Sequence, residues 1–178
     1  MKAILDRTIT PSSSGCAVRL SLTSEGLRPG RLDGAWWPRC GDLLLELPAL
    51  AAEIDERWGR ITRITVNPAQ WPVIPRRIPV AGHVVHAGWF TTEQDKHMIM
   101  VRSYAPRRLD LLVVPPQTDA VDAARLMVEA ADPANTRTAS ELLAMEPERR
   151  AKGLEPLNGT VRRAELARTQ AAYRAVGR

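Results

Sequence analysis

The sequence predicts an α+β protein in which an antiparallel sheet of about five strands has helices packed on one face. Three observations support this fold class. Residues 16–23 alternate apolar and polar side chains, residues 42–58 place apolar side chains on one helical stripe, and a hairpin-length connection at 103–106 joins two strand-like runs. A C-terminal helical extension completes the expected architecture.

The expected strands follow from alternation and from β-branched residues, and a proline-rich segment separates the second from the third. Residues 67–80 contain four prolines, which predicts an extended, polyproline-like connection and not a central strand. The five expected strands are Cys16–Thr23, Arg60–Val66, His83–Phe90, His97–Arg102 and Arg107–Val114.

Four helices are expected, and each has its own boundary signal. Pro48 lacks a backbone donor, so we expect a short turn near 42–46 and the first helix from Leu47 to Trp58. Thr138 and Glu141 have the spacing of a capping box. The remaining expected helices are 118–131, capped by Thr118 or Asp119, 138 to about 147, fading at Glu146-Pro147, and a basic helix over 161–176.

We expect three parts: a flexible leader over 1–15, a core domain over 16–131, and a helical, basic extension over 132–178. No apolar run approaches the length of a membrane span, and the N-terminal residues have no apolar stretch suited to a signal peptide. These features predict a cytoplasmic protein without a membrane partner. The two cysteines are then expected to be free thiols.

The basic residues are unevenly distributed along the chain. The net charge is +5 with a sequence pI of about 9.9, but the excess of Arg over Lys is typical of GC-rich coding, so the total says little. Residues 57–108 hold nine Lys or Arg against two Asp or Glu, and residues 147–178 hold eight against three. Such a surface can attract phosphate or an acidic partner, or it can be an ordinary solvated surface.

Side-chain alternation predicts where these arginines point. If the strands pair as expected, the outward positions form one basic patch on the uncovered side of the sheet, made of Arg19, Arg63, Arg102 and Arg108. Arg76 and Arg77 follow the proline-rich segment and join the candidate binding residues. The C-terminal extension adds Arg162, Arg163, Arg168 and Arg174.

Five tryptophans accompany only two tyrosines and one phenylalanine. Trp58 ends an apolar helix stripe and Trp89 lies on an apolar strand, so both are expected in the core. Trp36, Trp37 and Trp71 lie in proline-flanked segments and are expected to line a groove. Indole rings beside guanidinium groups are typical of platforms that bind single-stranded nucleic acid.

The sequence offers little for catalysis or metal binding. Common nucleotide-binding and hydrolase motifs are absent. His83 and His86 point to opposite sides of one expected strand, and no fixed ligand spacing joins His97 to either. Cys40 precedes an expected helix, but no base is assigned to it. No catalytic residue, metal or cofactor is therefore expected.

Three unusual strings carry a resemblance: LDGAWWPR (32–39), RWGRITRITVNPAQWPVIPRRIPVAGHVVHAGWF (57–90) and DLLVVPP (110–116). They are similar to a family of small proteins from high-GC Gram-positive bacteria, known only as a domain of unknown function. The resemblance covers roughly residues 16–131 and implies one core domain with a variable C-terminal extension. The family commonly has Ser where this chain has Cys40, which implies that the thiol is not catalytic.

The leading hypothesis is a non-enzymatic binding domain that meets nucleic acid or an acidic protein surface through the arginine-bearing sheet face and the basic tail. Two alternatives remain open. One is a small-molecule pocket or enzyme, lined by Trp36, Trp37, Trp71, His83 and His86. The other is a structural or regulatory homo-oligomer that pairs through a strand edge or through the Met98/Met100 surface.

Overall fold

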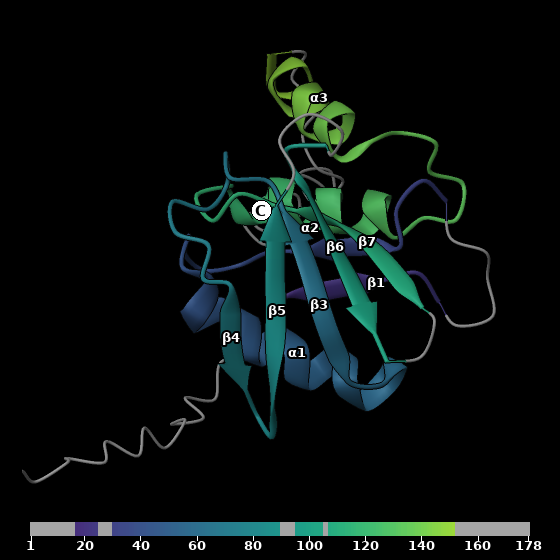
Figure 1. Cartoon of the computed structure of the whole chain (residues 1–178). Coiled ribbons are helices and arrows are strands. Elements are labelled where there is room, and N and C mark those ends of the chain that lie inside the picture. Colours follow the sequence, from purple (N-terminus) through teal and green to yellow (C-terminus); the bar gives the residue numbers. More distant parts are fainter. Residues whose placement is uncertain (1–16, 25–29, 90–94, 105–106, 152–178) are drawn as a thin grey trace, which may run out of the picture.

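The fold is taken from a computed structural model (Figure 1), which describes residues 17–24, 30–89, 95–104 and 107–151. The described residues form strands β1 (Leu20–Leu22), β2 (Gly34–Trp36), β3 (Ile61–Val66), β4 (Arg77–Val80), β5 (His83–Trp89), β6 (Met98–Ser103) and β7 (Arg108–Val113). The helices are α1 (Leu43–Trp58), α2 (Ala120–Ala130) and α3 (Ala139–Ala151). The expected leader and the expected helix over 161–176 lie outside the described residues.

The strands form one seven-stranded mixed sheet in the order β1-β2-β7-β6-β3-β5-β4. The pairs β2–β7 and β3–β5 are parallel, and the other neighbouring pairs are antiparallel. The α+β class is therefore confirmed, whereas the prediction of an antiparallel sheet of about five strands is only partly right, because the sheet has seven strands and two of its six pairs are parallel. Two short strands, β2 and β4, account for the difference in number.

Neither short strand has a clear sequence signal. β2 has only three residues, Gly34 to Trp36, all buried between β1 and β7. β4 contains Pro79 and falls in the segment that was expected to be a polyproline-like connection. It is an edge strand paired only with β5, and an edge is where a sheet tolerates proline.

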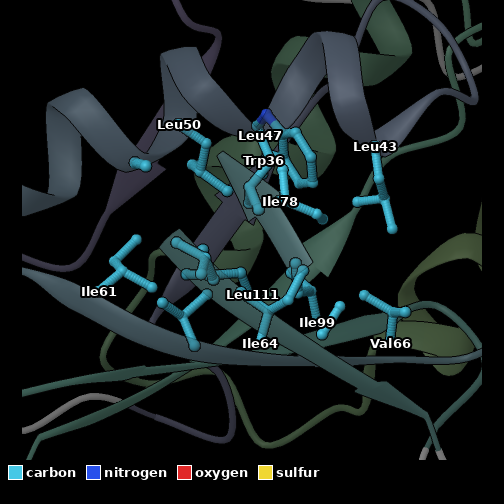
Figure 2. Close-up of a cluster of buried hydrophobic side chains, with 14 of the residues drawn as sticks. Trp36, Leu43, Leu47, Leu50, Ile61, Ile64, Val66, Ile78, Ile99 and Leu111 are labelled. Atoms are coloured by element: carbon cyan, nitrogen blue, oxygen red, sulfur yellow. The ribbon is translucent and has the colours of Figure 1, made fainter. Parts of the chain in front are cut away.

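Helix α1 packs on one face of the sheet, and in Figure 1 it lies behind β4, β5 and β3. Its apolar stripe includes Leu43, Leu47 and Leu50, which pack against the inward side chains of the strands (Figure 2). The Asp42 side chain accepts a hydrogen bond of 2.9 Å from the Leu44 N–H and caps the helix. The helix thus begins at Leu43 and continues through Pro48, which corrects the expected start near Leu47.

Helices α2 and α3 lie on the other face, at the end of the sheet formed by β1, β2 and β7, so the prediction of helices on one face is wrong. Both N-termini are where the sequence predicts them, with Asp119 capping α2. Thr138 and Glu141 form the expected capping box at α3. Helix α3 does not fade at Pro147 but continues to Ala151.

This arrangement leaves part of the second face uncovered. The front of β5, β3 and β6 in Figure 1 is overlaid by none of the three helices. Four outward side chains there are exposed, namely those of Arg63, Val84, His86 and Arg102, whereas Thr65 is buried and Met98 packs against the cluster under α2. We call this region the open face. None of the three helices in the described ranges has the length and apolar character needed to cross a membrane.

Candidate functional site

A line of basic side chains crosses the open face from strand to strand. The register places Arg77 opposite His86, His86 beside Arg63, Arg63 opposite Arg102, and Arg102 opposite Arg108. All five residues are exposed. Because neighbouring strands are about 4.8 Å apart, the line extends for on the order of 19 Å across β4, β5, β3, β6 and β7. We call these five residues the basic row.

A β-bulge in β3 brings Arg63 into the row. Ile61 pairs with Ser103 and Arg63 with Arg102, so the register shifts by one residue between them. The bulge allows Ile61 and Ile64 both to enter the core while Arg63 points outward. Strict alternation would place Ile61 and Arg63 on the same side of the sheet.

The charges in the row are not equivalent. Arg108 donates two hydrogen bonds, of 2.8 and 2.7 Å, to the carboxylate of Asp110, and these raise the pKa of the guanidinium. No carboxylate in the described part of the chain forms an ion pair with Arg63, Arg77 or Arg102. Among the described residues, the row's arginines without a carboxylate partner therefore lie on β4, β3 and β6.

An open pocket of about 430 Å³ adjoins the row over β3 and β5. Trp89 lines its edge and is 44% exposed, and the Arg76 guanidinium lies 5.8 Å from the ring centroid. Because Trp89 pairs with the buried Val66, alternation directs its side chain to the α1 side of β5, opposite to that of His86. Its lining residues are Arg63, Thr65, Arg76, His86, Ala87, Gly88 and Trp89.

Three of the five tryptophans, Trp36, Trp71 and Trp89, are placed opposite to expectation, whereas Trp58 packs against the core as expected. Trp36 and Trp71 are buried in the core and stack on each other with centroids 5.6 Å apart, because β2 is an inner strand and the turn after β3 folds onto it. Trp37 is half-buried under Arg19, and Trp58 is half-buried with Arg107 over its ring. Trp89 is exposed because β4 pairs with β5 only as far as His86.

Arg19 does not join the other predicted arginines. Its guanidinium donates to the carbonyl oxygens of Trp37 (2.9 Å) and Pro38 (2.7 Å) and lies 3.6 Å over the Trp37 ring. Burial, with a contribution from Arg39, lowers its pKa. The structure thus brings together Arg63, Arg102 and Arg108, with Arg77 in the same row and Arg76 in the pocket. The four tail arginines lie outside the described residues.

The remaining candidates are in structural roles. His83 Nε2 is 2.8 Å from the carbonyl oxygen of Ile61, and His97 Nδ1 is 2.9 Å from the side-chain nitrogen of Gln70. The Cys40 thiol contacts a Glu46 carboxylate oxygen at 3.2 Å, and burial raises the pKa of this thiol. Across the described ranges, no three His, Cys, Asp or Glu side chains are grouped to hold a metal ion.

The expected small-molecule pocket is also not formed by the residues proposed for it. Trp36 and Trp71 are buried, and of the five expected lining residues only His86 lines the pocket found here. The sequence reasoning missed Gly88 and Trp89. A glycine inside a strand pattern was the one available signal, since such a residue often marks close approach by a ligand or another backbone.

Comparison with known proteins gives one result. Residues 19–130 match a family of unknown function, DUF5994, and this range contains the whole basic row and the pocket. No curated protein and no solved structure matches the chain. The match covers more than half of the sequence and confirms the expected membership of an uncharacterised family. The chain belongs to the DUF5994 family.

Proposed function

We propose that this protein binds single-stranded nucleic acid across the open face of the sheet. The observation that carries the proposal is the basic row, in which Arg77, Arg63 and Arg102 lie on one line across the strands without an ion-pair partner among the described residues. Like charges placed opposite each other on a sheet reduce its stability. A polyanion that bridges them would remove this repulsion.

An exposed aromatic ring at the end of β5, that of Trp89, favours nucleic acid over an acidic protein surface, although alternation starts this side chain from the side of β5 opposite to His86. Bases stack on exposed aromatic rings while arginines contact the neighbouring phosphates. A carboxylate side chain does not stack on an indole ring in this way. The form of the surface favours a single strand over a duplex. Reading a duplex usually requires a helix or a two-stranded ribbon that enters a groove, whereas the basic row crosses the face of a sheet.

The test is binding of a fluorescent oligothymidylate of about 16 nucleotides, measured by anisotropy between about 50 and 200 mM salt. The double variant Arg63→Gln/Arg102→Gln removes two charges from the row. We expect it to bind at least about tenfold more weakly and to reduce the salt slope by about 1.4, because single strands lose about 0.7 per phosphate contact.

The charge-matched control is Arg57→Gln/Arg137→Gln. Both arginines are exposed and lie outside the basic row, one near the end of α1 and the other before α3. This variant should bind within about twofold of the unmodified protein at equal salt. Equal weakening by both variants would contradict the proposal, because binding would then depend on the total charge of the protein and not on the position of the arginines. Binding of polyglutamate but not of oligothymidylate would contradict it in favour of an acidic polypeptide.

A further inference from the structure

The pocket beside the basic row contains a glycine that the fold does not require. Gly88 lies inside β5, where a glycine weakens the strand because it is flexible and has no side chain to pack. Its backbone is not in the left-handed region that favours glycine. A Cβ at this position would have as its nearest heavy atom the Ile64 carbonyl oxygen at 4.0 Å, an ordinary contact. Neither backbone conformation nor packing explains the glycine.

The register places Gly88 on the same side of the sheet as the basic row. His86 and Gly88 are two residues apart on β5, and their partners on β3 are Arg63 and Thr65. These four residues all line the pocket, where Thr65 is buried and the other two side chains are exposed. A side chain at position 88 would therefore project into the pocket, beside Arg63 and His86. Its absence keeps this space open.

The charge around this space is positive. In the register, His86 lies between Arg77 on β4 and Arg63 on β3. None of the described residues that line the pocket is acidic. The register line through Thr65 meets its first carboxylate two strands away, at Asp110, which already accepts two hydrogen bonds from an arginine. An anion in the pocket would thus meet guanidinium and imidazole groups before any carboxylate on the described part of this face.

We propose that the pocket binds one phosphate group, held between Arg63 and His86 in the space that Gly88 leaves open. A guanidinium binds phosphate oxygens through paired, charge-assisted hydrogen bonds, and an imidazole N–H donates a further one. The pocket volume of about 430 Å³ also admits the attached sugar. This inference rests on the proposed function, since it gives one phosphate of the bound strand a fixed position on the open face.

The test is the substitution Gly88→Val, which fills the space and leaves every charge in place. A β-branched side chain suits a strand, so the melting temperature should equal or exceed that of the unmodified protein. Anisotropy with oligothymidylate measures the affinity over a series of salt concentrations. We expect the salt slope to fall by about 0.7, the value for one phosphate contact on a single strand, which corresponds to about fivefold in affinity at about 0.1 M salt.

A smaller substitution covers the case in which the valine variant does not fold. Gly88→Ala adds only a Cβ, which is at an ordinary contact distance from its nearest neighbour. It should weaken binding in the same direction but by less than Gly88→Val. A loss of affinity with an unchanged salt slope in either variant would contradict the inference, because no phosphate contact would have been removed.

Two comparisons show whether the loss arises at this phosphate. Val84→Ile adds bulk to an exposed position on the same face of β5 that does not line the pocket, and it should leave the affinity and the salt slope unchanged. Arg63→Gln alone should reduce the slope by about 0.7, and adding Gly88→Val should reduce it no further, because both substitutions remove the same contact. Equal weakening by Val84→Ile, or a further fall in slope in the double variant, would contradict the inference.

Three ligands identify the source of the phosphate: oligothymidylate without a 5′-phosphate, the same strand with one, and inorganic phosphate followed by NMR from the His86 ring signals. Equal losses for both strands in Gly88→Val would assign the pocket to an internal phosphodiester. A loss confined to the phosphorylated strand would assign it to the end of a strand. Gly88-sensitive binding of inorganic phosphate alone would assign it to the free anion.

Binding of all three ligands that does not depend on Gly88 would overturn the inference, and this outcome is separable from failure of the proposed function. If oligothymidylate binding depends on Arg63 and Arg102 while no ligand depends on Gly88, only the pocket inference fails. If inorganic phosphate binds in a Gly88-sensitive way and neither strand binds, only the proposed function fails.

Discussion

Arg63 of β3 lies directly opposite Arg102 of β6, and both guanidinium groups are on the open face. Opposed like charges on neighbouring antiparallel strands reduce stability by a few tenths of a kcal/mol up to about 1 kcal/mol. The sheet accommodates this repulsion although a neutral residue at either position would remove it. The two opposed charges therefore reduce the stability of the fold, whereas the proposed binding requires both of them.

The substitution Arg102→Gln tests this conflict directly. We expect it to raise the free energy of unfolding by up to about 1 kcal/mol at low salt, and the gain should shrink as salt screens the repulsion. Urea denaturation at two ionic strengths measures both effects. Arg57→Gln serves as the control, because it removes an exposed ion pair with Glu53 and should change stability little. A loss of stability in Arg102→Gln would show that the pair is not repulsive.

The stacked pair of Trp36 and Trp71 predicts a large effect in the core. Trp71 is 3% exposed, and its ring lies at an interplanar angle of 20° to that of Trp36. Trp71→Ala should reduce the free energy of unfolding by about 3–5 kcal/mol, as for other buried aromatic deletions. Trp89→Ala, at an exposed site, should cost much less. Comparable losses for the two variants in urea denaturation would contradict this account of the tryptophans.

Asp95 predicts a dependence of stability on pH. Burial raises the pKa of this carboxyl. Three hydrogen bonds, from the Ser140 hydroxyl (2.6 Å), the Ser140 N–H and the His97 N–H, together lower it by more than burial raises it, so the pKa is below its ordinary value. A carboxyl with a lowered pKa in the folded state stabilises the protein above its unfolded pKa. That contribution is lost as the pH falls through the folded pKa.

The variant Asp95→Asn should therefore be less stable at neutral pH, by about 1 kcal/mol if the loss resembles that of a helix cap, because Asp95 bonds the first turn of α3. The difference from the unmodified protein should begin to shrink as the pH falls below about 3.9, the ordinary pKa of an Asp, and should be lost only below the lowered pKa of the folded state. Urea denaturation over a pH series from about 7 to about 2 measures this. A difference that is constant with pH would indicate lost packing and not a lost charge.

Pro48 predicts a gain in stability. It lies within α1, where it cannot donate a hydrogen bond to the Leu44 carbonyl one turn earlier. Pro48→Ala restores that donor and should raise the free energy of unfolding by about 1 to 3 kcal/mol. Thermal melting followed by circular dichroism measures the change. A lower melting temperature would mean that the proline ring contributes packing or restricts the unfolded chain more than it weakens the helix.

The sequence was informative where a local pattern decides the structure. Asp119 and the Thr138/Glu141 pair define two helix N-termini because capping depends on a few adjacent residues. β-branched runs likewise marked β3. The three-residue β2 has no such pattern, because its strand geometry comes from partners far along the chain. Long-range pairing also decides which strand pairs are parallel.

The candidate site was only partly predictable for a related reason. Arg63, Arg102 and Arg108 were identified by alternation, but the bulge that aligns Arg63 is a property of the β3–β6 pair. The exposure of Trp89 depends on where β4 stops, and the burial of Trp71 depends on Trp36. Charge patterns are visible in one strand, whereas burial of an aromatic ring is decided by its neighbours in space. The expected origin of the family in high-GC Gram-positive bacteria stays a prediction.

The position of β2 has a consequence for how the protein is made. Gly34 pairs with Leu111, so β2, the second strand from one edge of the sheet, leaves the ribosome long before its partner β7 does. Until β7 is synthesised, the edge of β2 that faces β7 in the complete sheet has no partner strand. Closing so long a loop is slow compared with forming a local hairpin such as β4–β5. Pairing of β2 with β7 is therefore expected to be a late step in folding, and the step at which a helper that shields strand edges would matter most.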